Sequence, residues 1–355
     1  MTLPGLAHNE GLAFPALNGS WNSGMSLLTP DPKAMELYGA LTSSAGLIFL
    51  DQRTQLEING ADRTGFLNGF CTGDMKKLQP GSGCEVFITN HQGKAAGHGW
   101  VFCEADRLLF DGPPGQAEKL IAHLDRFVIS ERVEFRDHSA DWSDLLLAGP
   151  KAEDVLRQLG VESPTDRLQH RPVNIARCPV SLRRVDLLSP IPSFLLGLPR
   201  EETPALIAAF LNQGTQFNAG HASTTALEMA RLEAGYPFYG HDITEDNLPQ
   251  EVNRNEQAIS FTKGCYLGQE TIARLDALGH VNRILTGLKF PEGANPQPGE
   301  TIMQGEKKIA QITSVAYSPK LQSPLALAYV RSIHATPGKR IPYAGGEVEV
   351  VKLPL

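Results

Sequence analysis

One short segment, residues 263–270 with the sequence KGCYLGQE, contains the residue types that activate a thiol. We expect Cys265 to lie just before a helix over residues 269–278 that Gly279 caps at its C-terminus. The N-terminus of a helix and the neighbouring Lys263 both supply positive potential, which lowers the pKa of a thiol and raises its nucleophilicity. A buried structural cysteine in a strand-to-helix turn is the alternative, and the local sequence alone slightly favours that alternative.

A second segment, residues 231–240 with the sequence RLEAGYPFYG, suits recognition of a flat polar ring. It follows a predicted helix, and Glu228 and Glu233 lie near the end of that helix. A carboxylate held there can accept two hydrogen bonds from the edge of an aminopyrimidinone, which is a strong and orienting interaction. Surface charge beside a Gly-Pro loop is the alternative for either glutamate.

Other motifs that carry chemistry are absent from the sequence. Gly93-Lys94 precedes alanine rather than serine or threonine, so it lacks the magnesium ligand of a phosphate loop. The ten histidines are scattered, and neither HExxH nor GxSxG occurs, so metal binding has no support. The five cysteines form no CxxC pair and are odd in number, which argues against a disulfide framework or a zinc finger. They are Cys71, Cys84, Cys103, Cys178 and Cys265.

Length and composition limit the class of protein. With 355 residues, 41% of them hydrophobic, the chain suits two or three domains. A formal net charge of -7 argues against direct binding of nucleic acid over the whole surface. No run is apolar enough to span a membrane, and the first basic residue is Lys33, so we expect no secretory signal and a cytoplasmic location.

The elements that must position these residues fall into three regions. Residues 1–32 are rich in Gly, Pro, Asn and Ser, which predicts a loose N-terminal arm. Residues 33–279 alternate strand-like and helix-like runs, which predicts two lobes of mixed α+β structure. Residues 280–355 contain short strand-like runs separated by Gly and Pro, which predicts a small β-barrel or sandwich. We therefore assign the α+β fold class.

Taken together, these segments resemble the YgfZ/GcvT folate-binding family, relatives of the glycine-cleavage T protein. Residues 263–270 resemble the KGC[YF]xGQE motif of the YgfZ branch, and residues 231–240 are similar to the wider family's RxEAGxPxYG segment. Residues 60–67 resemble the GxDRxxFL helix start, and residues 326–330 resemble part of the C-terminal barrel. The resemblance covers roughly residues 40–355.

The resemblance implies a cloverleaf of two ferredoxin-like lobes and a C-terminal β-barrel around a folate pocket. It implies tetrahydrofolate as the cofactor, and a role linked to tRNA modification and to iron–sulfur client enzymes or assembly factors. Glu233 and Glu228 would meet the pterin, whereas Arg274, Arg231 or Lys94 would meet the acidic tail. The resemblance also places Tyr239 among the cofactor-binding residues, and Cys265 with Lys263 at the reactive centre.

One departure from the family pattern limits the chemistry. The aminomethyltransferases of this family carry an Asp pair after a Gly-Gly turn, whereas residues 95–98 here read AAGH. Without a positioned acid or base, proton transfer at the folate nitrogen would be slower by about 10²–10⁴-fold. The sequence therefore argues against ordinary aminomethyl transfer.

Three hypotheses follow for the function. The first is a tetrahydrofolate-binding accessory protein for iron–sulfur enzymes, in which Cys265 is the reactive thiol. The second is a folate-dependent aminomethyl or methyl transferase, which needs another acid or base such as His98 or Asp242. The third is a binding scaffold whose folate pocket has decayed.

Overall fold

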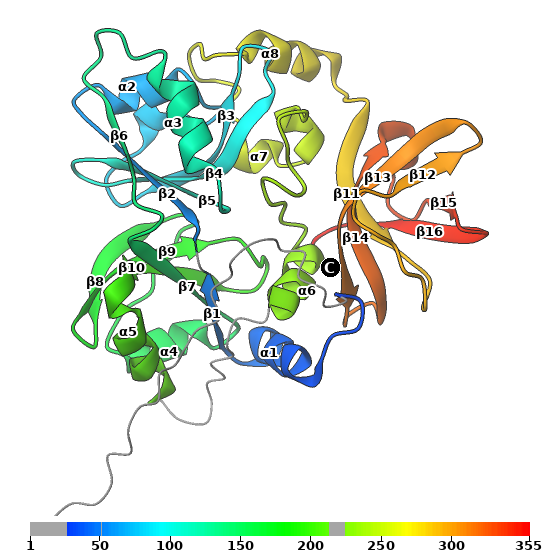
Figure 1. Ribbon diagram of the computed structural model, residues 1–355, viewed down its shortest axis with the longest axis horizontal. Helices are drawn as coiled ribbons and strands as arrows, with labels where there is room; N and C mark the ends of the chain where they lie inside the picture. The colour runs from blue at the N-terminus through cyan, green and yellow to red at the C-terminus, as the bar shows by residue number, and fades with distance from the viewer. Residues whose placement is uncertain (1–26, 51, 213–223) are drawn as a thin grey trace, which may run out of the picture.

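The structure of the chain, a computed structural model, describes residues 27–50, 52–212 and 224–355. Three antiparallel sheets surround a group of helices, with two lobes on one side and a barrel on the other (Figure 1). The predicted N-terminal arm over residues 1–32 lies outside the described residues except for 27–32. Within the described ranges, no helix has both the length and the apolar character needed to cross a bilayer.

Lobe one is a five-stranded sheet in the order β3-β4-β5-β2-β6, covered by α2 and α3. Its core forms because α3 turns Leu120 and Leu124 towards the apolar face of the sheet, where they are about 1% exposed. The strands are β2 (Thr54–Asn59), β3 (Gly83–Thr89), β4 (Ala95–Cys103), β5 (Leu108–Gly112) and β6 (Glu134–Asp137), and the helices are α2 (Arg63–Asn68) and α3 (Ala117–Asp125).

Lobe two is a second five-stranded sheet, in the order β1-β7-β10-β9-β8. Its core contains Leu145 and Leu147 of β7 and Leu196 of β10, packed with the apolar side chains of α4 and α5. The strands are β1 (Gly46–Leu50), β7 (Trp142–Ala148), β8 (His170–Ile175), β9 (Cys178–Val185) and β10 (Ser193–Pro199), and the helices are α4 (Ala152–Gln158) and α5 (Thr203–Leu211).

The strand-like stretch 47–59 is shared between the two lobes. Its first half, β1, pairs with β7 in lobe two, and its second half, β2, pairs with β5 in lobe one. The two lobes also meet through buried charges, because Asp111 of β5 accepts hydrogen bonds from Arg53 at 2.8 Å and from Arg183 of β9 at 2.6 Å. The two lobes are therefore connected by the shared chain segment and by buried ion pairs at their interface.

The third part is a six-stranded sheet in the order β12-β13-β14-β11-β16-β15. Its outer strands, β12 and β15, contact each other, so the sheet is a nearly closed barrel. This confirms the predicted α+β architecture with a C-terminal barrel. The strands are β11 (Arg283–Lys289), β12 (Thr301–Gln304), β13 (Lys307–Ser318), β14 (Ser323–Arg331), β15 (Arg340–Tyr343) and β16 (Gly346–Val351).

A central segment runs between the lobes and the barrel. It contains α6 (Thr224–Ala234), the short helices η3 (Pro249–Val252) and α7 (Asn255–Ala258), and α8 (Gln269–Leu278). Helix α6 packs against β13, β14 and α1 (Pro32–Ser43). The structure confirms the helix predicted over residues 269–278, which ends at Gly279 in the left-handed conformation with φ 71°.

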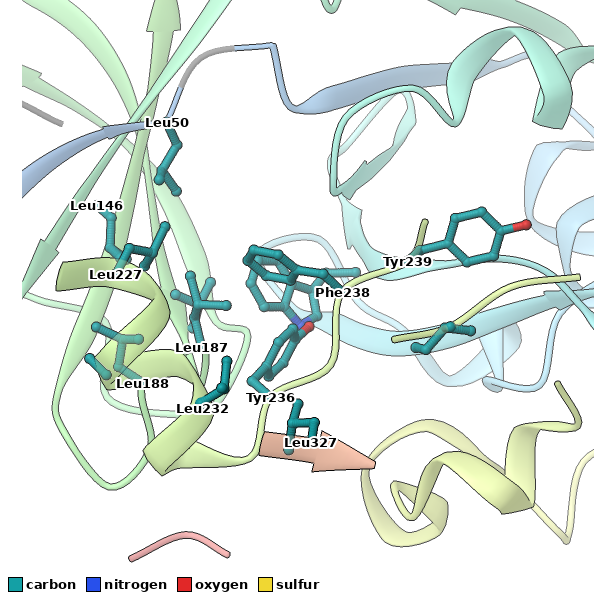
Figure 2. Packing of buried hydrophobic residues seen from close by; sticks show 14 of the residues in the cluster. Leu50, Leu146, Leu187, Leu188, Leu227, Leu232, Tyr236, Phe238, Tyr239 and Leu327 are labelled. Carbon is teal, nitrogen blue, oxygen red and sulfur yellow. The ribbon is translucent and has the colours of Figure 1, made fainter. Parts of the chain in front are cut away.

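One apolar cluster links the central segment to the rest of the molecule (Figure 2). Leu227 and Leu232 of α6 lie near Leu187 of lobe two, whereas Tyr236 lies beside Leu327 of the barrel. All five side chains are at most 3% exposed. Because the cluster draws on several parts of the chain, its burial fixes α6 between lobe two and the barrel.

We expect Leu196→Ala to lower the free energy of unfolding by about 2–5 kcal/mol, because it leaves a cavity in the lobe-two core. Leu211→Ala at the end of α5 is the matched control, since Leu211 is 53% exposed and its truncation should change stability by less than about 0.5 kcal/mol. Urea unfolding followed by circular dichroism measures both. Equal effects would show that Leu196 is not packed as described.

Candidate functional site

Lys263 fixes the segment around Cys265 to lobe one. Its ammonium group donates hydrogen bonds to the backbone oxygens of Asn68, Cys71 and Gly73, at 2.8, 2.8 and 2.6 Å. It also lies 5.0 Å from the ring centre of Tyr266. Burial lowers the pKa of Lys263, but the nearby Cys71 and Asp74 oppose that shift. The ammonium therefore has a clear structural use, which is to hold this segment in place.

Further contacts fix the segment on both sides of Cys265. Thr72 donates its hydroxyl to the Ala258 carbonyl at 2.6 Å, before the cysteine. After the cysteine, Thr89 donates to the Leu267 carbonyl at 2.7 Å, and the Leu267 amide donates to Gly69 at 2.8 Å. We call residues 263–268, held in this way, the cysteine loop.

Gly268 is needed where the cysteine loop crosses lobe one. Its φ of 78° is left-handed, and a Cβ atom there would lie 2.4 Å from the Asn90 oxygen and 2.5 Å from the Gly93 Cα. Only glycine allows two backbones to approach so closely in that conformation. The turn at Gly93 is therefore packed directly against the N-terminus of α8.

Cys265 differs from the other four cysteines in its exposure. It is exposed, whereas Cys71, Cys103 and Cys178 are buried and Cys84 is half-buried. Burial raises the pKa of the Cys71 thiol to about 11 and also raises the pKa of Cys84. A thiolate is the reactive form of cysteine, so Cys265 is the best placed of the five to react with a partner in solution.

Two α6 residues predicted to contact folate, Glu228 at the pterin and Arg231 at the acidic tail, bind each other instead. Arg231 donates to Glu228 at 2.8 Å, to the Tyr236 backbone oxygen at 2.7 Å and to Asp242 at 2.7 Å. Its guanidinium also lies 4.5 Å from the ring centre of Phe238. Arg231 is 1% exposed, and the two carboxylates raise its pKa. These contacts anchor the loop after α6.

Glu233 joins three other parts of the chain. Its carboxylate accepts hydrogen bonds from the Tyr38 hydroxyl of α1 at 2.6 Å, from the Ser318 hydroxyl of β13 at 2.6 Å and from the Lys320 amide at 3.1 Å. Burial and the adjacent carboxylate raise the pKa of Tyr38. Glu233 thus has a structural role in the described geometry, and its predicted contact with a pterin stays a prediction.

The remaining candidate residues lie nearer to α8 and lobe one. Tyr239 donates its hydroxyl to the Ala96 oxygen at 2.8 Å. Lys94 is about a third exposed and lies 3.6 Å from the exposed Asp246. Arg274 is exposed on α8, and among the described residues it has no hydrogen-bond or ion-pair partner. Arg274 and Lys94 are therefore the candidate cations that remain accessible to an anion.

Sequence reasoning missed a buried ionic centre at Glu85. The carboxylate of this β3 residue accepts hydrogen bonds from Arg254, from Arg167 and, at 2.8 Å, from His98. Asp186 pairs with the same two arginines, at 3.0 and 2.9 Å. The only sequence signal was a carboxylate inside the apolar run 83–89, which needs buried cations to be stable.

The two acid–base residues named for a transferase have different surroundings. His98 is fully buried, and its Nε2 atom is engaged by Glu85. Asp242 accepts hydrogen bonds from Thr313 at 2.5 Å and from Ser314 at 2.7 Å, besides its pair with Arg231. Within residues 27–50, 52–212 and 224–355, no three His, Cys, Asp or Glu side chains are grouped so as to hold a metal ion.

Comparison with known proteins identifies the family. Residues 34–263 match the domain described as the GCVT N-terminal domain, and residues 283–355 match the glycine cleavage T-protein C-terminal barrel domain. The first match alone covers more than half of the chain. The chain therefore belongs to the GcvT family.

Individual relatives agree with this assignment. An aminomethyltransferase from Caldanaerobacter subterraneus is 26% identical over 309 residues, covering 85% of this chain and 81% of the relative. One from Thermus thermophilus is 28% identical over 308 residues, covering 83% and 82%. The crystal structure of the glycine cleavage system aminomethyltransferase T from Bartonella henselae has a TM-score of 0.79 at 20% identity, covering 92% and 90%. At that identity, the structural match supports the fold.

We expect Glu85→Gln to lower the free energy of unfolding by about 1–3 kcal/mol at pH 7, because it removes the buried carboxylate that Arg254 and Arg167 bind and leaves only Asp186 to balance the two arginines. The arginines and His98 hold the pKa of Glu85 well below its usual value. A depressed pKa contributes stability above the unfolded pKa of about 4.3 and loses it as the pH falls. The difference between wild type and variant should therefore shrink below about pH 4.3.

Urea unfolding at a series of pH values from 7 to 3 measures this difference. Glu347→Gln is the control, because Glu347 is exposed on β16 and its pair with Arg340 spans 3.8 Å. A constant difference between wild type and Glu85→Gln across the series would contradict the buried pairing.

Proposed function

We propose that this chain binds a reduced folate and uses Cys265 to support iron–sulfur enzymes. The observation that carries the proposal is the cysteine loop, which holds an exposed thiol between firmly anchored neighbours. Lys263 and Leu267 are tied to lobe one, so Cys265 is presented in one position rather than on a loose turn. A thiol in a fixed position loses less conformational entropy when it engages a partner.

The described residues suit the acidic tail of tetrahydrofolate better than they suit its pterin ring. Arg274 and Lys94 suit its acidic tail, because their cationic groups are accessible. Glu228 and Glu233 already accept hydrogen bonds from protein groups, so a pterin would have to share or displace those donors. The buried Oδ1 atom of Asp186 has no hydrogen-bond partner among the described residues, which leaves it free to accept from a ring amine.

The chemistry that the chain itself supplies is that of one thiol. The Cys265 thiolate can act as a nucleophile, as a transient ligand of an iron–sulfur cluster or as a redox partner. A single cysteine cannot complete the ligand set of a cluster, so client enzymes or assembly factors would supply the other ligands. Bound folate would supply one-carbon chemistry, and its acidic tail would be oriented by Arg274 and Lys94.

A folate-dependent aminomethyl or methyl transferase is the second candidate, and the relatives named aminomethyltransferase favour it. The residues of this chain give it less support. Residues 95–98 contain no carboxylate, Asp242 is engaged by Arg231, Thr313 and Ser314, and His98 is paired with Glu85. Formation of a one-carbon folate from an aminomethyl donor by the purified chain would make this candidate the preferred one.

We expect tetrahydrofolate to bind saturably, and Arg274→Gln to weaken that binding about ten-fold through the loss of a charge-assisted contact. Isothermal titration calorimetry measures the affinity. Tetrahydropteroate lacks the glutamate tail, so its affinity should be the same for wild type and variant. Arg157→Gln on α4 is the control cation. Absence of saturable heat would instead support a scaffold with a decayed folate site.

We expect Cys265→Ala to abolish support of an iron–sulfur client enzyme, measured as the client's activity in cells that lack the native protein. Gly264→Ala is the matched control, because a Cβ atom at Gly264 meets nothing within 4 Å and the thiol is retained. It should support the client as wild type does. Full support by Cys265→Ala would remove the thiol from the mechanism while leaving folate binding intact.

A further inference from the structure

A cavity of about 410 Å³ lies where β11, β13 and β14 of the barrel meet η3. None of its residues belongs to the cysteine loop, to α6 or to the cations assigned to the folate tail. Its wall contains one carboxylate, Glu251, and three cations, Arg283, Lys308 and Arg331. The charged groups around the cavity therefore sum to about +2, which is opposite in sign to the net charge of the whole chain.

The carboxylate in this wall is already neutralised. Arg283 donates two hydrogen bonds to Glu251, at 3.0 and 3.1 Å, and Glu251 also accepts from the Leu248 amide at 3.2 Å. The other two cations have no such partner. Lys308 donates to the neutral Gln311 at 2.7 Å, and the exposed side chain of Arg331 has no hydrogen-bond or ion-pair partner among the described residues. The uncompensated charge thus resides on Lys308 and Arg331.

The register of the barrel places two of these cations together. Arg283 of β11 is directly opposite Arg331 of β14 in the antiparallel pairing. Like charges at directly opposed positions destabilise a sheet. Glu251 already offsets the charge of Arg283, and an anion beside Arg331 would offset the rest. The planar guanidinium of Arg331 can bind two carboxylate or phosphate oxygens at once.

A buried hydroxyl completes the set of donors. Tyr329 lies two residues before Arg331 on β14, lines the same cavity and is 5% exposed. Its hydroxyl has no hydrogen-bond partner among the residues that the structure describes. The guanidinium of Arg283 lies 4.9 Å from the centre of its ring. A buried hydroxyl without a partner is costly, so a ligand oxygen that accepts from it would be stabilised.

We propose that this cavity is a binding site for a small organic or inorganic anion of the carboxylate or phosphate class. Arg331 and Lys308 attract the anion at the rim, Arg283 flanks it, and Tyr329 donates to one of its oxygens. The size of the cavity fits a small molecule rather than a folded partner. The site shares no residue with the proposed folate site or with the cysteine loop. The anion-binding proposal and the proposed function can therefore be tested, and can fail, separately.

The test uses the full chain and two probes, inorganic phosphate and glutarate, in isothermal titration calorimetry at low salt. We expect saturable binding of at least one probe, and tighter binding of phosphate or of glutarate tells which class the site prefers. Arg331→Gln should weaken binding roughly ten-fold or more. Tyr329→Phe, which removes only the hydroxyl, should also weaken it without lowering the melting temperature of the free protein.

Lys307→Gln is the matched control, because Lys307 is an exposed cation of β13 next to Lys308 that does not line the cavity. It should leave both affinities within about two-fold of wild type, since only screened long-range charge is lost. Three results would overturn the proposal. They are no saturable binding of either probe, equal affinity in wild type and Arg331→Gln, and equal weakening by Lys307→Gln.

Discussion

The carboxylate of Glu85 is removed from water and surrounded by nitrogen donors from three parts of the chain. His98 comes from lobe one, Arg167 from lobe two and Arg254 from the central segment. A buried charge is tolerated only when its partners are in place, so none of these parts can move without exposing an unpaired ion to an apolar interior. The relative arrangement of the two lobes and the central segment depends on this cluster.

The cysteine loop follows from that constraint. Arg254 is fixed by Glu85, and the chain then passes through α7 to Ala258, whose carbonyl is bound by Thr72 of lobe one. Further along the chain, Lys263 binds three backbone oxygens of lobe one and holds the cysteine loop against that lobe. The motif around Cys265 therefore divides into residues that hold the backbone and one exposed residue that can react.

The sequence was sufficient for the architecture and for the helix after Cys265, because apolar periodicity and the Gly279 cap are local signals. It could not show that β1 and β2 belong to different lobes, since strand pairing is set by distant partners. Glu233 lies near the end of α6 as predicted, whereas Glu228 lies in the middle of that helix and pairs locally with Arg231. The partners of Glu233, Tyr38 and Ser318, depend on tertiary packing. The ionic centre at Glu85 was missed for the same reason.

The most direct test of the account is selective alkylation of Cys265 in the native full chain, followed by assays of folate binding and of client support. The other four thiols have raised pKa values and are buried or half-buried, so modification should be confined to Cys265, as peptide mass spectrometry would show. Protein alkylated at Cys265 should bind tetrahydrofolate with unchanged affinity but should no longer support an iron–sulfur enzyme. Full support by protein that is stoichiometrically alkylated at Cys265 would contradict this prediction.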